Sequence, residues 1–177
     1  MTPANDALIQ IVEYDPAWPR LFEVEKALLS PLLAPWLIGP VEHVGSTGVP
    51  GLSAKPVIDI MAAIESLDAS KEAIAALRGI EYQYAPYRTD IMHWFCKPSP
   101  SFRTHHLHLV PYQSRLWKER IIFRDGLRSD PALARAYLDL KSHLAAMYPS
   151  DREAYTDGKG PFIAETLQRL VSEYNET

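Results

Sequence analysis

The sequence predicts an α+β protein, an α/β sandwich in which helices flank a mixed sheet of about five strands and the C-terminal third is helical. The 177 residues match one domain of ordinary size, and no repeat or Ser/Gly-rich linker divides them, so we expect a single domain over residues 1–177. Segments rich in β-branched and aromatic residues occupy the middle of the chain. After Pro111 the apolar residues recur at helical spacing.

The N-terminal part is expected to hold a strand, a helix and a pair of strands. Residues 8–14 alternate as in a strand, and Asp15-Pro16 opens a helix through about Leu29, because proline is tolerated in the first turn. Residues 41–46 and 56–64 are predicted to be two strands joined by a Gly/Pro-rich turn. Ser70 is predicted to cap a short helix that ends near Arg78.

Three more strands and three helices complete the prediction. The strands are predicted at 81–87, 91–97 and 102–110, which are rich in aromatic and β-branched residues and bounded by Pro or Asp. The helical spacing beyond Pro111 predicts helices at about 114–127, 131–147 and 161–174. Strands first and helices later are typical of helices that cover one sheet.

Composition excludes several classes of protein. The formal net charge of −4 argues against a binder of duplex nucleic acid or of an anionic membrane, since both need a basic face. Cys96 is the single cysteine, so an intrachain disulfide and a thiolate zinc cage are excluded. The longest uncharged stretch, residues 27–41, is interrupted by prolines and too short to span a bilayer, and no signal peptide is recognised at the start. A cytoplasmic protein is expected.

The turn between residues 43 and 59 carries the strongest chemical signal. Gly45-Ser46 follows a predicted strand, and Lys55 and Asp59 precede and enter the next one. Glycine lets backbone N–H groups point inward, and a hydroxyl and an ammonium group beside them suit phosphate oxygens. The segment is not a Walker A loop, because Lys55 lies between Ala54 and Pro56. A plain connecting turn remains the alternative.

Asp59 is unusual because it lies in the apolar run Val57-Ile58-Asp59-Ile60-Met61. Burying an unpaired carboxylate costs several kcal/mol. Unless Asp59 faces the solvated end or edge of the sheet, we expect a cation, a metal ion or several N–H donors beside it.

The chain resembles the GrpB family, which is similar in fold to polymerase-beta-type nucleotidyltransferases. The matching residues are Tyr14-Asp15-Pro16 with Trp18, His43-Val44-Gly45-Ser46-Thr47, Val49-Pro50-Gly51-Leu52, Ala54-Lys55-Pro56, Ile58-Asp59, Thr104-His105-His106-Leu107-His108, and Tyr155 with Lys159-Gly160-Pro161-Phe162-Ile163. In that superfamily a Gly-Ser step holds nucleotide phosphates and an Asp-x-Asp strand with a third carboxylate holds two Mg²⁺ ions. The resemblance therefore implies phosphate binding by Gly45 and Ser46 and metal binding by Asp59. Met61 stands in place of the second carboxylate.

The histidine segment offers substitute ligands. Strand periodicity places His106 and His108 on one face, about 6 to 7 Å apart, and His105 on the other, where a core or edge role is expected. If this strand lies beside the Asp59 strand, His106 or His108 would stand where the superfamily keeps its third carboxylate. Such a set favours Mn²⁺, Zn²⁺ or Fe²⁺ over Mg²⁺. A histidine-triad hydrolase pattern fits less well, because Thr104 stands where that family expects its first histidine.

Basic residues supply further candidates for phosphate binding. Lys159 lies just before the helix predicted from Pro161, and a helix N-terminus also favours anions. Arg103 adjoins the histidine strand and is equally suited to a surface role. Three arginines follow at intervals of four in the helix predicted after Pro111, where solvated positions beside the apolar stripe are expected and a contact with nucleotide phosphate is the alternative. They are Arg120, Arg124 and Arg128.

Together these patterns predict a nucleotide-binding protein that transfers a nucleotidyl or phosphoryl group to a small molecule. Asp59, His106 and His108 would hold a divalent metal ion (Mg²⁺, Mn²⁺ or Zn²⁺) or move protons. Gly45, Ser46, Lys55, Arg103 and Lys159 would hold the phosphates of a nucleoside triphosphate or another phosphorylated small molecule. The alternative is a non-catalytic ligand-binding or accessory module, as the resemblance implies from similar domains fused to dephospho-CoA kinases. The sequence identifies neither the acceptor nor the nucleotide, the metal or the oligomeric state.

Overall fold

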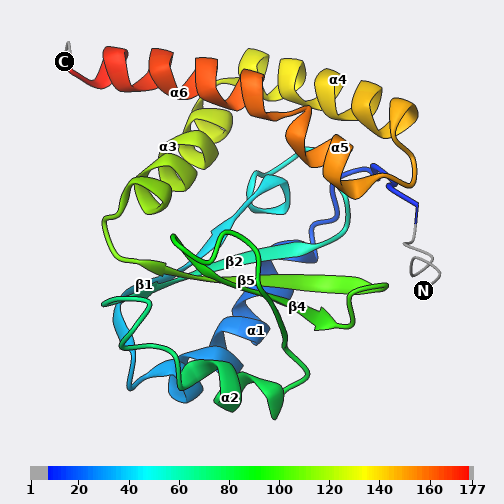
Figure 1. The fold of residues 1–177 in the computed structure, drawn as a ribbon. Coiled ribbons are helices and arrows are strands. Elements are labelled where there is room, and N and C mark those ends of the chain that lie inside the picture. The colour runs from blue at the N-terminus through cyan, green and yellow to red at the C-terminus, as the bar shows by residue number, and fades with distance from the viewer. Residues whose placement is uncertain (1–7, 176–177) are drawn as a thin grey trace.

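A mixed sheet of five strands forms the centre of the computed structural model, which describes residues 8–175 (Figure 1). The strand order is β1-β2-β5-β4-β3; β2 and β5 run parallel, and the other neighbouring pairs are antiparallel. The strands are β1 (Leu37–Val44), β2 (Ile58–Ile64), β3 (Gln83–Ala85), β4 (His93–Pro98) and β5 (Arg103–Pro111). The predicted α+β class with a mixed five-stranded sheet is confirmed.

Helices lie on both sides of the sheet. α1 (Trp18–Leu33) and α2 (Ala73–Arg78) lie on one side, and α3 (Arg115–Ser129), α4 (Pro131–Met147), α5 (Arg152–Asp157) and α6 (Gly160–Asn175) lie on the other (Figure 1). A single 3-10 turn, η1 (Ser46–Gly48), follows β1. The predicted helical C-terminal third is confirmed, and none of the helices in residues 8–175 is both long and apolar enough to cross a membrane.

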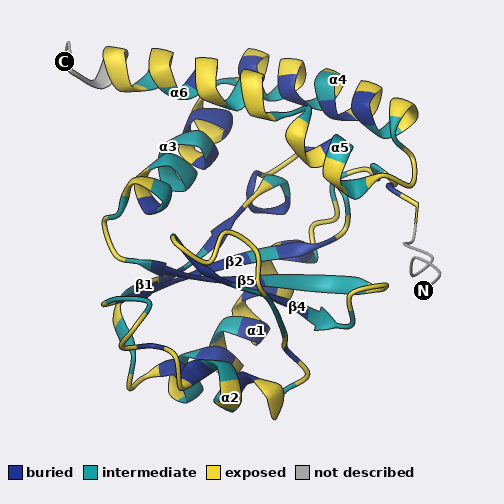
Figure 2. Cartoon of the chain, in the orientation of Figure 1, coloured by how far each residue is buried: buried dark blue, intermediate teal, exposed yellow. Residues whose placement is uncertain are grey.

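Strand periodicity gives the sheet two different faces. Toward α1 and α2, the strands contribute fully buried side chains such as Ile60 and Leu107 to the largest apolar cluster. Toward α3, Met61 packs in a smaller cluster with Trp117, and Asp59 precedes it on the same face of β2. Buried residues accordingly line the strands in Figure 2, while the outer sides of α4 and α6 are exposed. The face toward the C-terminal helices is therefore the one that holds Asp59.

The C-terminal helices also pack on the loop that leads from β1 to β2. Val49 and Leu52 of this loop form an apolar cluster with Leu127, Leu133 and Tyr137. The start of α4 is fixed by Asp130, whose carboxylate accepts hydrogen bonds from the N–H groups of Ala132 and Leu133. As a result of this packing, side chains of α3 and α4 lie close to the loop that contains the Gly-Ser turn.

Two predicted elements are wrong in detail. Residues 8–14 form a single bridge, Val12 with Ala54, and no strand, because Ile9 packs with Leu144 and Tyr155 of the helical layer and not with the sheet. Ser70 does not cap α2: its hydroxyl donates to backbone carbonyls of residues 66 and 67, and the helix begins three residues later.

The remaining predictions differ mainly at their ends. α1 continues past the expected Leu29 and through Pro31, because Leu29 and Leu33 are both fully buried and keep the last turn in place. α3 begins one residue after the predicted start, with Ser114 as its cap, and the α4 bounds match the prediction. α5 was missed; Asp151 caps it by accepting from the N–H of Ala154.

Candidate metal and phosphate site

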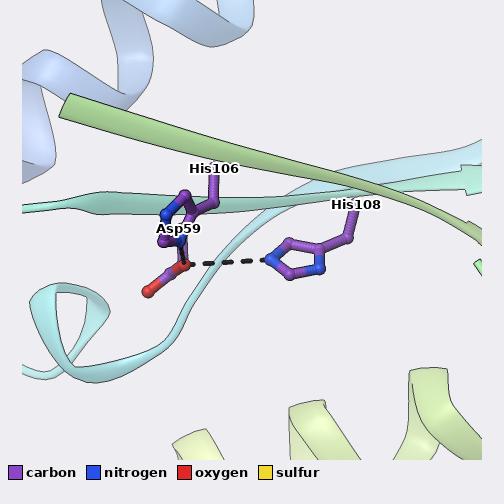
Figure 3. A group of neighbouring side chains, drawn as sticks. All are labelled: Asp59, His106 and His108. Atoms are coloured by element: carbon purple, nitrogen blue, oxygen red, sulfur yellow. Dashed lines mark hydrogen bonds and ion pairs between the residues drawn. The ribbon is translucent and has the colours of Figure 1, made fainter. Parts of the chain in front are cut away.

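Asp59, His106 and His108 meet on the sheet face that lies toward the C-terminal helices. The parallel register of β2 and β5 pairs Asp59 with His106 and Met61 with His108. The Nδ1–H of His106 donates to Asp59 Oδ1 at 2.9 Å, and Nε2 of His108 lies 3.8 Å from the same oxygen (Figure 3). One potential ligand atom from each residue lies within 4.8 Å of the others. The predicted grouping of these three residues is therefore present, although their chemical role remains a prediction.

The charges within this group are set by burial and by mutual contacts. Burial would raise the pKa of Asp59, but the hydrogen bond from His106 and the nearby ring of His108 outweigh it and hold that pKa well below its usual range. Burial and, to a smaller extent, the positive charge of Arg120 lower the pKa of His108 to about 3. At neutral pH the group therefore presents an ionised carboxylate and a neutral imidazole, the protonation states that metal ligands require.

Unpartnered nitrogen atoms support a metal at this place. Nε2 of His106 and Nε2 of His108 are buried and have no hydrogen-bond partner among the described residues. Because Asp59 accepts the Nδ1–H of His106, the neutral ring carries its free electron pair at Nε2. Leaving such atoms buried and unpaired costs free energy, which a metal ion would offset. One carboxylate and two imidazoles suit Mn²⁺, Zn²⁺ or Fe²⁺.

A second carboxylate is absent at the position where the resemblance expects one. Met61 is fully buried and packs in the apolar cluster with Trp117. Within residues 8–175, Asp59, His106 and His108 are the one group of three or more such ligands that could hold a metal ion. The described residues therefore fit one ion held by these side chains and give no support for a pair of Mg²⁺ ions.

The Gly-Ser turn lies directly against Asp59. Gly45 has φ +70° and ψ −175°, a conformation that essentially only glycine adopts. A Cβ atom at Gly45 would collide with Oδ2 of Asp59 and lie 3.0 Å from its Cβ and Cγ atoms. Ser46 follows on η1, and its side chain lowers the pKa of the Tyr137 hydroxyl from α4, which burial raises. Gly45 and Ser46 therefore lie at the carboxylate, as predicted.

The predicted cations are found near the same carboxylate. The pKa of Lys55 is lowered to about 8 by burial and by the positive charges of Arg152 and Arg103. The charge of Asp59 opposes this shift. Burial also lowers the pKa of Lys159 to about 8, against the opposing charge of Asp59. The ammonium group of Lys159 lies 4.4 Å from the ring centroid of Tyr155.

Arg103 begins β5 at the border of the group. Its guanidinium lies 5.2 Å from the ring centroid of Trp94, and that ring contacts His106 at 5.1 Å. Its Nε–H donates to the carbonyl of Pro100. His105, as expected, points away, with Nδ1 2.9 Å from the Thr104 hydroxyl.

The three arginines of α3 differ in exposure: Arg124 and the Nε atom of Arg120 are buried, contrary to the expectation, whereas Arg128 is exposed as expected. Arg124 donates to Glu42 at 2.6 Å and to the carbonyl of His43 at 3.1 Å, and Arg128 donates twice to the carbonyl of Gly48. These carbonyls belong to β1, which is an edge strand of the sheet, and to η1. Arg124 and Arg128 thus hold the Gly-Ser turn in place.

His43 locks the same turn from inside. The single hydroxyl proton of Thr47 is donated to the carbonyl of Val57, so the Nε2–H of His43 must donate to Thr47 Oγ1, at 3.0 Å. The ring also stacks on Phe22 with centroids 4.7 Å apart. Burial lowers the pKa of His43 to about 4 although the charge of Asp59 raises it. His43 is therefore neutral and structural at neutral pH.

This assignment predicts acid sensitivity. Below pH 6.5 an unfolded histidine binds a proton, whereas folded His43 does so only near pH 4, so stability falls as pH drops through this window. The loss due to His43 should reach about 3 kcal/mol at pH 4. In His43→Gln the slope of unfolding free energy against pH, measured by urea denaturation between pH 4 and 7, should be shallower. An unchanged slope would contradict the assignment.

Two residues near the site were missed or misjudged from the sequence. Tyr137 was assigned no role, because a tyrosine at helical spacing in 131–147 is typical of a core position. Arg120 was expected to be solvated, yet its Nε atom is buried. No local signal indicates that either side chain faces Asp59, since the packing of α3 and α4 on the sheet decides it.

Comparisons with known proteins agree with this architecture. The family model described as GrpB protein matches residues 8–169. A UPF0157 protein of Pseudomonas aeruginosa is 40% identical over 96% of this chain and 70% of its own length. The glutamate-rich protein GrpB of Alkalihalophilus pseudofirmus is 34% identical over 96% of this chain and 100% of its own.

Solved structures give the same result for the fold. The crystal structure of conserved protein GrpB from Enterococcus faecalis superposes with a TM-score of 0.83 at 32% identity, covering 93% of this chain and 99% of that one. A family match over nearly the whole described chain and relatives of this similarity show that the chain belongs to the GrpB family.

Proposed function

We propose that this protein binds a nucleotide or another phosphorylated small molecule together with one divalent metal ion, and transfers a nucleotidyl or phosphoryl group. The observation that carries the proposal is the convergence of an ionised carboxylate with two imidazoles whose buried Nε2 atoms have no partner among residues 8–175. The residues concerned are Asp59, His106 and His108. A bound divalent ion would supply Lewis-acid polarisation of a phosphoryl oxygen.

The electrostatics around this group favour an anionic substrate. The negative charge of Asp59 opposes the lowering of the pKa of Lys55, Arg120 and Lys159 by burial. The positive charge of Arg103 lowers the pKa of Lys55. The chain as a whole carries a formal charge of −4, so these cations make a local positive site on an acidic protein. Such a site attracts phosphorylated ligands. Duplex nucleic acid is repelled by the rest of the surface, which is acidic. In the proposal, Lys55, Lys159 and the Gly45-Ser46 turn hold the phosphates.

The Asp59–His106 pair also suits proton transfer. The carboxylate fixes the ring of His106 by accepting its Nδ1–H, which leaves one electron pair at Nε2, and this pair either binds the metal ion or, as the alternative role, accepts a proton from an attacking hydroxyl group. In the same proposal His108, neutral at physiological pH, serves as a ligand. These roles require His106 and His108 to act together with Asp59 and not as separate structural residues.

A second candidate function is a non-catalytic ligand-binding or accessory module. One observation favours it: Met61 stands where the second carboxylate of the two-metal mechanism is expected, and it is fully buried among apolar side chains. A thioether in that position cannot hold Mg²⁺. A protein that binds the ligand and has lost the chemistry would keep the phosphate-binding residues and show this replacement.

Binding and turnover separate the two functions. Under the proposal, nucleoside triphosphates with Mn²⁺ or Zn²⁺ should raise the melting temperature by about 5 to 10 °C at 100 times the dissociation constant. Radiolabelled nucleotide should then be consumed only with metal present. Binding without turnover would support the accessory module, whereas no binding of metal or nucleotide would exclude both functions.

A further inference from the structure

Arg120, Arg124 and Arg128 form a row along one side of α3, because residues four apart in a helix lie on the same face. Two members of the row are fully engaged within the protein. Arg124 donates to Glu42 and to the His43 carbonyl, and Arg128 donates to the Gly48 carbonyl. The row therefore contains two arginines with evident structural roles, against which the third can be compared.

Arg120 differs from both neighbours in the row. Its Nε atom is buried, and no hydrogen-bond partner for that atom occurs among the described residues. Burial lowers the pKa of Arg120, and the charge of Asp59 opposes that shift. Bringing a guanidinium out of water is costly unless its donors are satisfied, so an unsatisfied buried donor indicates a partner that is not part of the chain.

The surroundings of Arg120 place it at the proposed site. Its positive charge lowers the pKa of His108 and of Lys159, and it also lowers the pKa of Tyr137, against the effect of burial. The positive charge of Arg88, from the loop between β3 and β4, lowers the pKa of Arg120. Asp59 is thus the carboxylate whose charge acts on both Arg120 and Lys159, and Arg88 adds a third positive charge that acts on Arg120.

We propose that Arg120 is the residue that binds the phosphate group of the substrate beside Asp59 and His108, with Lys159 and Arg88 completing the anion site. A guanidinium offers two parallel N–H donors that match two oxygens of a phosphate group. Three cations around one carboxylate match a dianion such as a phosphate monoester better than the single charge of a carboxylate ligand. This inference rests on the proposed function and names the residue that selects the substrate.

The test compares anion binding with folding stability. Arg120→Met keeps an unbranched chain of similar size and removes the charge, so affinity for inorganic phosphate and pyrophosphate, measured by isothermal titration calorimetry, should fall about 10- to 100-fold. The melting temperature should stay unchanged or rise, because an unsatisfied buried charge has been removed. Arg120→Lys should keep part of the affinity, since it restores the charge without the two parallel donors.

Arg124→Met is the matched control from the same helix face. It should lower the melting temperature, because Glu42 and the His43 carbonyl lose their donor, and it should weaken phosphate binding less than Arg120→Met does, since Arg124 reaches the site only through the Gly-Ser turn. The inference is overturned if Arg120→Met lowers the melting temperature as much as Arg124→Met and leaves phosphate affinity unchanged. An equal loss of affinity in both variants would also overturn it, since the site would then depend on α3 as a whole.

These outcomes are distinguishable from failure of the proposed function. Wild-type protein that binds phosphate through Arg120 but neither binds metal nor turns over nucleotide would retain the anion site and exclude metal-dependent transfer. Wild-type protein that binds metal at Asp59 but gives no heat with phosphate or pyrophosphate would exclude the role of Arg120 alone.

Discussion

Asp59→Asn is expected to abolish divalent metal binding. Asp59 provides the anionic oxygen of the three-residue group, and an amide oxygen is a much weaker ligand. The substitution also removes the charged acceptor that fixes the ring of His106. Even outer partners of metal ligands contribute 10- to 100-fold to affinity, so the affinity for Zn²⁺ or Mn²⁺ should fall by at least about 100-fold. Titration calorimetry and metal analysis of the purified protein measure this loss.

Strand β5, which carries His106 and His108, offers a close control. His105 adjoins His106 but bonds to Thr104 and lies toward Glu25 on the opposite face, so His105→Asn should leave metal affinity unchanged. His106→Asn should reduce occupancy as Asp59→Asn does. Equal affinity in Asp59→Asn and wild-type protein, or an equal loss in His105→Asn, would show that the group is no metal site.

The elements that sequence predicted well are those whose signals are local. The predicted start of α4 at Pro131 is correct, and the structure shows that it is fixed within three residues by the first-turn proline and the cap Asp130. Residues 8–14 have the alternation of a strand, but their apolar side chains pack with α4 and α5, a choice made by distant parts of the chain. α5 is too short, at six residues, to show helical periodicity.

The candidate site shows the same difference between features that depend on local signals and features that depend on long-range packing. Period two along β5 was sufficient to place His106 and His108 on one face, and the structure confirms that geometry. The pairing of β5 with β2, which brings His106 and His108 to Asp59, is a long-range feature. No local pattern predicts it, and the sequence indicates it only through the resemblance to a family. Arg120 could not be distinguished from Arg124 and Arg128 by spacing, because all three recur every four residues. Their different partners arise from the way α3 crosses β1 and η1.

Gly45→Ala is expected to destabilise the protein by about 3 kcal/mol, which combines a backbone conformation reserved for glycine with overpacking. The new Cβ atom would collide with Oδ2 of Asp59. For a domain of this size the melting temperature should fall by about 10 °C. Gly51→Ala is the matched control: Gly51 also has positive φ, at +78°, but a Cβ there has no atom within 4 Å, so its cost should be smaller.

A double-mutant cycle isolates the contact between Gly45 and Asp59. Asp59→Ala removes the carboxylate that a Cβ at Gly45 would meet, so Gly45→Ala should cost about 1 to 2 kcal/mol less in the Asp59→Ala background than in the wild type. The backbone strain is the same in both backgrounds and cancels. Strict additivity of the two substitutions would mean that the Gly-Ser turn does not press on the carboxylate. Phosphate held by that turn would then lie too far from Asp59 to share a metal ion with it.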